Sequence, residues 1–331
     1  MGEGELLVMK KLFLGVEIGA TKHQICLGDE NGNIYCTVQG KVVLKDGVAG
    51  ILEWMKWNIP VLIGRETEFG GKAAAIGVGF GGIIESVSGI SLVSVQVDGW
   101  KDFNLKQWFE NTFKLSAVIL NDTVAGGYGE YHCGSGKGSK NFFYTNIGSG
   151  IGGVFILNGR YYDGIGYGAA YFGHTYIPDW TSSNPGGFCK VENMCSGFAI
   201  ERRLRSKGYV PADSTIMKMC CGKSEDIQCL MLEQAAREGD SFSIEEIDRI
   251  ALSYAVGLSN VITLVSPDCI SIGGGVAKMG DLLLEPVRKY VDRKVFISSK
   301  GRYRIVESAF MDSAVLVGTV LYAAHELDNA K

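Results

Sequence analysis

Short apolar runs alternate with glycine-containing turns along the chain, a pattern typical of an α/β protein. Apolar runs predict strands, and apolar residues at helical spacing predict helices. In the first third of the chain the strands fall at residues 12–17, 23–27, 75–80 and 117–120, and the helices at residues 48–58 and 105–113. A short turn joins the first two strands, which indicates a β-hairpin. This part of the chain is therefore predicted to be a mixed α/β domain.

A similar order of elements recurs further along the chain. Strands are predicted at residues 142–147 and 153–157, again joined by a glycine turn and followed by the hairpin tip Asn158-Gly159. Residues 196–264 are mostly helical in pattern, a strand follows at residues 269–272, and the final helix covers residues 313–327. We predict two domains without a flexible linker: a small lobe of residues 1–121 plus 312–331, and a large lobe of residues 122–311.

Composition limits the kinds of partner. The 331 residues carry a formal net charge of −4, without the basic surface that a nucleic-acid backbone requires. No apolar run reaches the ~20 residues that span a bilayer, and residues 1–10 contain no export or lipidation signal. The nine cysteines do not form the pattern of a disulfide-stapled domain. We expect a soluble, cytoplasmic protein with no nucleic-acid or membrane partner.

Glycine turns after strands are the candidates for phosphate binding. Three of them stand out: Gly19-Ala20-Thr21-Lys22, Gly148-Ser149-Gly150 and Gly273-Gly274-Gly275. Glycine lets main-chain N–H groups approach phosphate oxygens closely, and Thr or Ser adds a hydroxyl donor. None has the spacing of a P-loop or of the Rossmann fingerprint. Each turn alone is also consistent with a tight hairpin, but together they indicate a nucleotide site.

Asp122 is the candidate general base. It follows Asn121 at the end of a predicted buried strand, where a fixed backbone can aim a carboxylate into a cleft. Phosphoryl transfer to an alcohol requires a group that accepts the hydroxyl proton in line with the γ-phosphate. The alternative reading of Asp122 is the N-cap of a helix that starts at Thr123, and the two roles are compatible.

These motifs together resemble the repressor/open-reading-frame/kinase (ROK) family of bacterial sugar kinases, and the resemblance extends from Leu12 to Ala324. It implies a two-domain actin-like ATPase (ribonuclease H-like) α/β fold with a cleft between the lobes. The first two glycine turns resemble the family's phosphate motifs, and the third its adenosine-side glycines. Glu17, which leads the first motif, is then expected to hold Mg²⁺ through water.

The resemblance also implies a sugar site. Residues 77–82 are similar to the family's sugar-cleft loop, with Gly81, followed by Gly82, in place of its usual proline. Asn121 and Asp122 match the pair whose Asp is the family's catalytic base, and Asn121 is expected to contact the sugar. Glu192 matches a sugar-binding Glu.

The run Tyr171-Phe172-Gly173-His174 departs from the family's Glu-x-Gly-His. Tyr171 therefore replaces a sugar-binding carboxylate, and a phenol cannot accept two hydroxyl donors as a carboxylate can. His174 is expected either to contact sugar or to be an ordinary loop histidine. The family's zinc cysteines are reduced to Cys189, with Lys190 at the position of the last one, so we expect no tight structural zinc.

The resemblance implies an ATP- and Mg²⁺-dependent hexose kinase, a homodimer that phosphorylates the 6-hydroxyl of glucose or a related sugar. ATP or polyphosphate as donor and the identity of the sugar stay open. The alternative is a catalytically weak sugar- or nucleotide-binding regulator. A DNA-binding repressor is disfavoured because only eleven residues precede Leu12, too few for a helix-turn-helix domain.

Overall fold

The computed structural model describes residues 9–93, 97, 99–182 and 186–329. The chain forms two compact units: unit 1 comprises Met1–Gly134, Tyr162–Ala169 and Ser313–Lys331, and unit 2 comprises Ser135–Tyr161 and Ala170–Asp312. Residues 1–8, on which the expected lack of a targeting signal depends, lie outside the described residues. Within the described ranges, no helix combines the length and apolarity that crossing a membrane requires.

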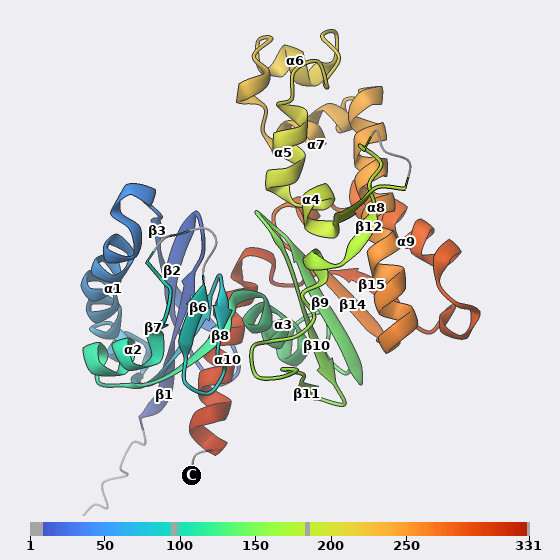
Figure 1. Ribbon diagram of the computed structural model, residues 1–331. Coiled ribbons are helices and arrows are strands. Elements are labelled where there is room, and N and C mark those ends of the chain that lie inside the picture. Colours follow the sequence, from blue (N-terminus) through green and yellow to red (C-terminus); the bar gives the residue numbers. More distant parts are fainter. Residues whose placement is uncertain (1–8, 94–96, 98, 183–185, 330–331) are drawn as a thin grey trace, which may run out of the picture. The chain divides into compact units, whose positions relative to one another are not determined.

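Unit 1 is built on a five-stranded sheet with helices on both faces (Figure 1). In sheet order β3-β2-β1-β4-β8, the strands are β3 (Ile34–Lys41), β2 (Lys22–Gly28), β1 (Lys10–Ile18), β4 (Gly71–Phe80) and β8 (Ser116–Asn121). β1, β4 and β8 run parallel, whereas β2 and β3 are antiparallel to their neighbours. A smaller sheet contains β5 (Ile83–Ile84), β6 (Ile90–Val93) and β7 (Phe103–Asn104).

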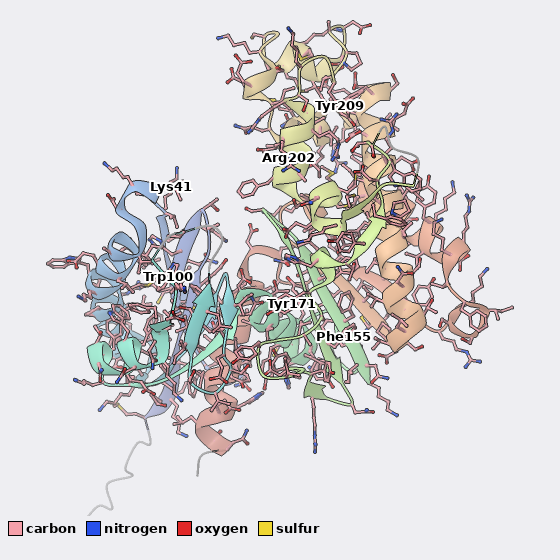
Figure 2. All side chains as sticks on the ribbon, in the orientation of Figure 1. Lys41, Trp100, Phe155, Tyr171, Arg202 and Tyr209 are labelled. Atoms are coloured by element: carbon pink, nitrogen blue, oxygen red, sulfur yellow. The ribbon has the colours of Figure 1, made fainter. Side chains whose placement is uncertain are left out.

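The central strand of unit 1 is buried on both faces, as expected of a parallel sheet covered by helices. Leu12 and Leu14 of β1 share a core with α1 (Gly47–Ile63) and α2 (Leu105–Phe113). Phe13 points to the other face and packs with α10 (Ala314–Asn329). The large aromatic Trp100 is buried in the first of these cores (Figure 2).

Helix α3 (Asp122–Cys133) packs against α10 at very short range. A Cβ on Gly318 would lie 1.6 Å from the carbonyl oxygen of Ala125, so only glycine permits this approach. The sequence-based division at residue 121 separated α3 from the final helix. In the structure both belong to unit 1, because this close packing joins them.

Unit 2 contains a second five-stranded sheet, covered by the long helix α8 (Ser241–Val265) and by α9 (Asp281–Lys294). In the order β11-β10-β9-β14-β15, its strands are β11 (Arg160–Tyr161), β10 (Ile151–Leu157), β9 (Asn141–Ile147), β14 (Cys269–Gly273) and β15 (Arg304–Glu307). A two-stranded sheet is formed by β12 (Tyr176–Pro178) and β13 (Phe188–Lys190). The remaining helices are α4 (Val191–Cys195), α5 (Gly197–Leu204), α6 (Thr215–Met219) and α7 (Cys229–Arg237).

The strands predicted from apolar runs and the helices predicted from helical spacing are confirmed. The elements that were not foreseen are β3, β15, α9 and the short strands β5, β6, β7, β12 and β13. β3 is an edge strand in which no side chain is fully buried, so its sequence lacks an apolar run. β15 is short, with a single buried residue. Both strands are therefore specified mainly by the neighbours with which they pair.

The β2–β3 hairpin is held by the buried carboxylate of Asp29. Asp29 accepts hydrogen bonds from Lys10 Nζ at 2.7 Å, from Tyr35 Oη at 2.6 Å and from the backbone N–H of Asn33 at 3.1 Å. Burial disfavours the charged form, but these donors outweigh it and hold the pKa of Asp29 well below its usual range. The charged carboxylate therefore stabilises the folded state.

Asp29→Asn is expected to lower the free energy of unfolding at pH 7 by about 1.5–3 kcal/mol, because charge-assisted hydrogen bonds are lost. A depressed folded pKa gives stability that is present above the unfolded pKa and disappears as the pH falls through the folded pKa. Urea unfolding should therefore show the difference between wild type and variant narrowing below about pH 4. A difference that does not change between pH 7 and pH 3 would contradict this account.

Candidate functional site

The predicted site residues of unit 1 meet at one edge of its sheet. In the parallel pairs, Ile18 of β1 lies opposite Phe80 of β4, and Phe80 lies opposite Asn121 of β8. The three strands therefore end together at their carboxyl edge. The turn after β1, the Gly81-Gly82 loop after β4 and Asp122 after β8 are all brought to this edge.

The first glycine turn is a tight hairpin connection between β1 and β2. The N–H of Gly19 donates to the carbonyl of Lys22 at 3.0 Å, and Ala20 and Thr21 form the tip. The carboxylate of Glu17 is largely buried below the turn. It accepts a hydrogen bond from the side chain of Gln24 and lies 3.9 Å from Lys22 Nζ. The turn thus presents Lys22 and Glu17 close to each other.

The Gly81-Gly82 loop is tied down by backbone hydrogen bonds. Gly81 N–H donates to the carbonyl of Ile18 at 2.8 Å, and Gly82 N–H donates to that of Phe80 at 2.9 Å. The side-chain amide of Asn121 donates to the carbonyl of Gly82 at 3.1 Å. The Gly81 N–H therefore ties the loop to the end of β1, and the Asn121 amide ties it to the end of β8.

Asn121, not Asp122, is the N-cap of α3. Its backbone is extended, and its Oδ1 accepts the N–H groups of Thr123 at 3.0 Å and Val124 at 3.3 Å. The alternative assignment of Asp122 as the N-cap was wrong, because Asp122 is the first residue of the helix. The cap frees Asp122 from that structural task.

The carboxyl group of Asp122 has one tethered oxygen and one beside the glycine loop. Oδ1 accepts the N–H of Thr123 at 2.7 Å, while a Cβ on Gly81 would come within 3.3 Å of Oδ2. Burial raises the pKa of Asp122 to about 6, and the hydrogen bonds from Thr123 oppose this shift only in part. A carboxylate with a raised pKa is a stronger proton acceptor than an ordinary one.

In unit 2 the second and third glycine turns lie side by side. Asn146 of β9 pairs with Gly273 of β14, so the turns that follow these two parallel strands share one edge of the sheet. Gly274 adopts a φ of +89°, and a Cβ on it would come 2.6 Å from the carbonyl oxygen of Ile147. Asn146 Oδ1 also accepts the N–H of Gly152 at 2.9 Å, a supporting contact that the sequence did not reveal.

The glycines of these turns have two different reasons to be glycine. Gly274 is required by its own backbone conformation and by its contact with Ile147. A Cβ on Gly148 would meet only one atom, at 3.9 Å, and a Cβ on Gly275 would meet no atom within 4 Å. Because packing within the described chain does not demand glycine at those two positions, the open space fits the close approach of a ligand such as a nucleotide phosphate.

The neighbouring glycines Gly274 and Gly275 should therefore respond differently to alanine. Gly274→Ala is expected to destabilise unit 2 by about 1–3 kcal/mol, because it combines a strained φ with a backbone clash. Gly275→Ala should leave the unfolding free energy within about 0.5 kcal/mol of wild type and weaken nucleotide binding. Urea unfolding and calorimetric titration with AMPPNP would measure the two effects. Equal stability of both variants would contradict the distinction.

Tyr171 and His174 lie in a turn beside β12, and Figure 2 labels Tyr171. Tyr171 is 40% exposed, and its ring centroid is 6.4 Å from that of His174. Lys190 Nζ lies 3.0 Å from His174 Nδ1. An ammonium group has only donors, so Nδ1 is the acceptor and the proton of a neutral His174 lies on Nε2. This lysine contact was not predicted.

His174 and Cys189 are the two remaining candidates for zinc ligands in this segment. Cys189 lies on β13, and burial raises the pKa of its thiol. Among the residues that the structure describes, no group of three or more His, Cys, Asp or Glu side chains is arranged to hold a metal ion.

Glu192 contacts the second glycine turn directly. It lies in α4, and its Oε2 accepts the N–H of Ile151 at 2.8 Å. Glu192 is partly buried and serves as an acceptor within unit 2. The sequence marked Glu192 only through a resemblance in its position, and nothing in the spacing indicated the contact with Ile151.

Comparisons with known proteins agree with this architecture. Residues 13–326 match the ROK family. The chain is 29% identical over 317 residues to a glucokinase of Thermotoga maritima. The matched region covers 94% of this chain and 96% of the relative. It is 26% identical to a putative xylose repressor of a Caldicellulosiruptor species, over 93% of this chain and 77% of the repressor.

A solved structure of a ROK family glucokinase from Streptomyces griseus, in complex with glucose and AMPPNP, is also similar. Its TM-score is 0.80 at 26% identity, and the match covers 95% of this chain and 99% of that chain. The predicted α/β, two-domain actin-like ATPase fold is thereby confirmed.

Proposed function

The chain belongs to the ROK family, and from this we propose that it is a sugar kinase in which Asp122 deprotonates the hydroxyl group that attacks the γ-phosphate of ATP. The observation that carries the proposal is Asp122 itself. Its carboxyl group stands at the carboxyl edge of the unit 1 sheet, beside the Gly81-Gly82 loop, with a pKa raised to about 6 by burial. The glucokinase relatives support the same class of reaction.

The reaction is a direct transfer of the phosphoryl group. The sugar hydroxyl gives its proton to Asp122, a bond forms between the hydroxyl oxygen and the γ-phosphorus, and the bond from that phosphorus to the bridging oxygen of ADP breaks. We propose the 6-hydroxyl of a hexose as the acceptor, with glucose as the first candidate. Gly81, Gly82, Asn121, Tyr171, His174 and Glu192 are the proposed sugar-side residues.

The glycine turns are the proposed phosphate ligands. The turns at residues 19–22 and 148–150 would bind the phosphates through main-chain N–H groups other than those of Gly19 and Gly148, which donate to carbonyl groups within the turns. Residues 273–275 would lie on the adenosine side. The open space around Gly148 and Gly275 supports this assignment. Lys22, held near Glu17, is a further donor for phosphate oxygens.

Mg²⁺ fits a site with few protein ligands. Glu17 offers a single carboxylate, and Mg²⁺ bound through substrate phosphates keeps several of its own waters. We propose that Glu17 holds one of these waters. When bound, the ion would neutralise charge on the phosphates and orient them.

A coupled ADP-release assay with Mg-ATP tests the proposal across hexoses, N-acetylhexosamines and amino sugars, with inorganic polyphosphate as an alternative donor. Sugar-dependent ADP release well above the sugar-free rate is the expected result. The preferred sugar would also show what Tyr171 does in place of a carboxylate. If no sugar stimulates ADP release while AMPPNP still binds, the kinase proposal fails in favour of a sugar- or nucleotide-binding regulator. The xylose repressor among the relatives is the observation that favours that second candidate.

A further inference from the structure

The carboxylate of Glu192 lies against the second glycine turn. Its Oε2 accepts the N–H of Ile151 at 2.8 Å, and a Cβ on Gly150 would lie only 2.6 Å from the same oxygen. Ile151 is buried, so water does not replace this charged acceptor for its N–H. Glycine at position 150 thus leaves room for the carboxylate under the turn.

The helices that follow Glu192 hold the other end of the same turn. The N–H of Gly197, at the start of α5, donates to the carbonyl of Gly148 at 2.8 Å. The N–H of Ser196 donates to the carbonyl of Glu192 at 3.1 Å, which joins α4 to α5. The α4–α5 junction therefore fixes the turn at both Gly148 and Ile151.

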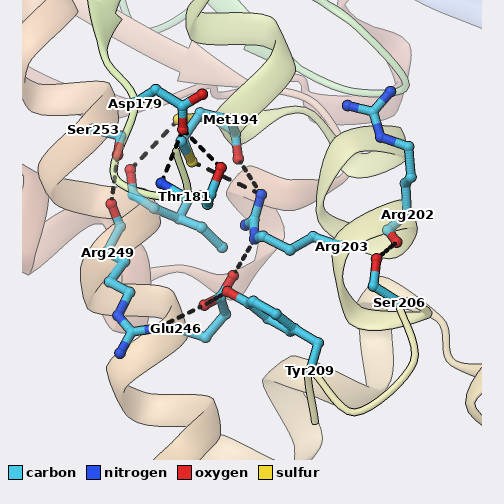
Figure 3. Close-up of polar contacts among 12 residues, drawn as sticks. Asp179, Thr181, Met194, Arg202, Arg203, Ser206, Tyr209, Glu246, Arg249 and Ser253 are labelled. Atoms are coloured by element: carbon cyan, nitrogen blue, oxygen red, sulfur yellow. Dashed lines mark hydrogen bonds and ion pairs between the residues drawn. The ribbon is translucent and has the colours of Figure 1, made fainter. Parts of the chain in front are cut away.

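This junction is anchored to the long helix α8 by a buried ion pair (Figure 3). Arg203 of α5 donates through Nη1 to the carbonyl of Met194 at 3.0 Å and through Nε to Glu246 at 2.6 Å. Glu246 is 1% exposed and also accepts from Tyr209 Oη at 2.8 Å. Figure 3 shows the neighbouring Arg202 extending away from this network. A helix of only five residues such as α4 is not stable by itself. Its position therefore depends on the contacts that join the α4–α5 junction to α8.

We propose that Glu192 is a positioning residue for the nucleotide, which sets the Gly148–Gly150 turn in its phosphate-binding conformation through the hydrogen bond from Ile151. This inference rests on the proposed function, in which the turn binds phosphate, and adds to it a role of Glu192 separate from contact with sugar. A role confined to sugar predicts no effect on nucleotide binding in the absence of sugar. The positioning role predicts an effect under that condition.

The test is calorimetric titration of the full chain with Mg-AMPPNP in the absence of sugar, for wild type, Glu192→Ala and Glu192→Gln. Alanine removes the acceptor and is expected to weaken nucleotide affinity about tenfold or more, whereas glutamine keeps an acceptor oxygen and should stay within about threefold. Glu238→Ala, which removes an exposed carboxylate at the end of α7, is the matched control and should leave the affinity unchanged.

Amide hydrogen exchange of the segment 147–153, without ligand, gives an independent readout of the turn. Exchange should be faster in Glu192→Ala than in Glu192→Gln, because the glutamine retains a side-chain acceptor for the Ile151 N–H. Glu192→Asp keeps the charge but shortens the side chain, and should behave like alanine. If the alanine variant does not fold, Glu192→Asp replaces it in the comparison with Glu192→Gln.

Equal nucleotide affinity of wild type, Glu192→Ala and Glu192→Asp would overturn the inference, as would equal weakening by glutamine and alanine. The assay of sugar-dependent ADP release in wild type separates the two claims. If the wild type is active and its nucleotide affinity equals that of the Glu192 variants, only the positioning role is excluded. If the wild type is inactive but the nucleotide affinities of wild type, Glu192→Gln and Glu192→Ala follow the expected order, the kinase proposal is excluded and the positioning role is retained. A wild type that binds no nucleotide removes both.

Discussion

Asp122→Asn is expected to lower kcat by about 10²- to 10⁴-fold, the usual contribution of a general base. Asparagine is nearly isosteric and its side-chain oxygen can still accept the N–H of Thr123, which now donates to Asp122 Oδ1 at 2.7 Å. Nucleotide and sugar affinities should therefore stay close to those of wild type. Steady-state kinetics and AMPPNP titration would measure the two effects separately.

Asp102→Asn is the matched control for that variant, because Asp102 is exposed in a left-handed conformation that asparagine also adopts readily. The pH dependence gives a second test of the base. Asp122 must be ionised to accept a proton, and burial raises its pKa to about 6. The value of kcat/KM should thus fall as the pH drops below about 6, about tenfold per unit. Activity of Asp122→Asn near the wild-type level would exclude Asp122 as the base.

Glu246→Ala is expected to lower the free energy of unfolding of unit 2 by about 3–5 kcal/mol, because removal of one partner leaves a buried charge uncompensated. Arg203, whose side chain is only 11% exposed, would lose the carboxylate that now lies 2.6 Å from its Nε. Tyr209 would lose its acceptor as well. Urea unfolding followed by circular dichroism would measure the loss.

Glu245→Ala is the control for Glu246, because Glu245 is exposed and lies 3.7 Å from the exposed Arg249. Its loss should change stability by less than about 0.5 kcal/mol. A double variant, Arg203→Met with Glu246→Leu, should be more stable than Glu246→Ala, since apolar residues of similar volume leave no buried charge. If Glu246→Ala were as stable as Glu245→Ala, the ion pair would not anchor the α4–α5 junction.

Most of the fold could be predicted from the sequence because its strands and helices have strong patterns of apolar residues. β1 and β4 are long apolar runs, and α10 is apolar throughout most of its length, so burial was predictable without tertiary information. β3 was missed because it is an edge strand without fully buried residues. The division at residue 121 placed α3 and α10 in different lobes. Their contact, between Gly318 and Ala125, joins residues far apart in the chain, so a local sequence pattern does not show it.

The sequence by itself determined which residue types are available at the strand ends. These are the glycine turns after β1, β9 and β14, and the carboxylate of Asp122 after β8. Such assignments depend on local order, since a strand followed by a small-residue turn is encoded within a few positions. The same local order misassigned the N-cap of α3, because the choice between Asn121 and Asp122 depends on backbone angles.

Only the tertiary structure decided how these groups are oriented. Burial raises the pKa of Asp122, and the carbonyl group of Ile147 requires glycine at position 274. Glu192 contacts the N–H of Ile151, just after the second glycine turn, from helix α4. Each of these effects depends on atoms distant in sequence that come within a few ångströms after folding. A linear pattern does not specify such approaches, because they are set by the packing of whole elements against one another.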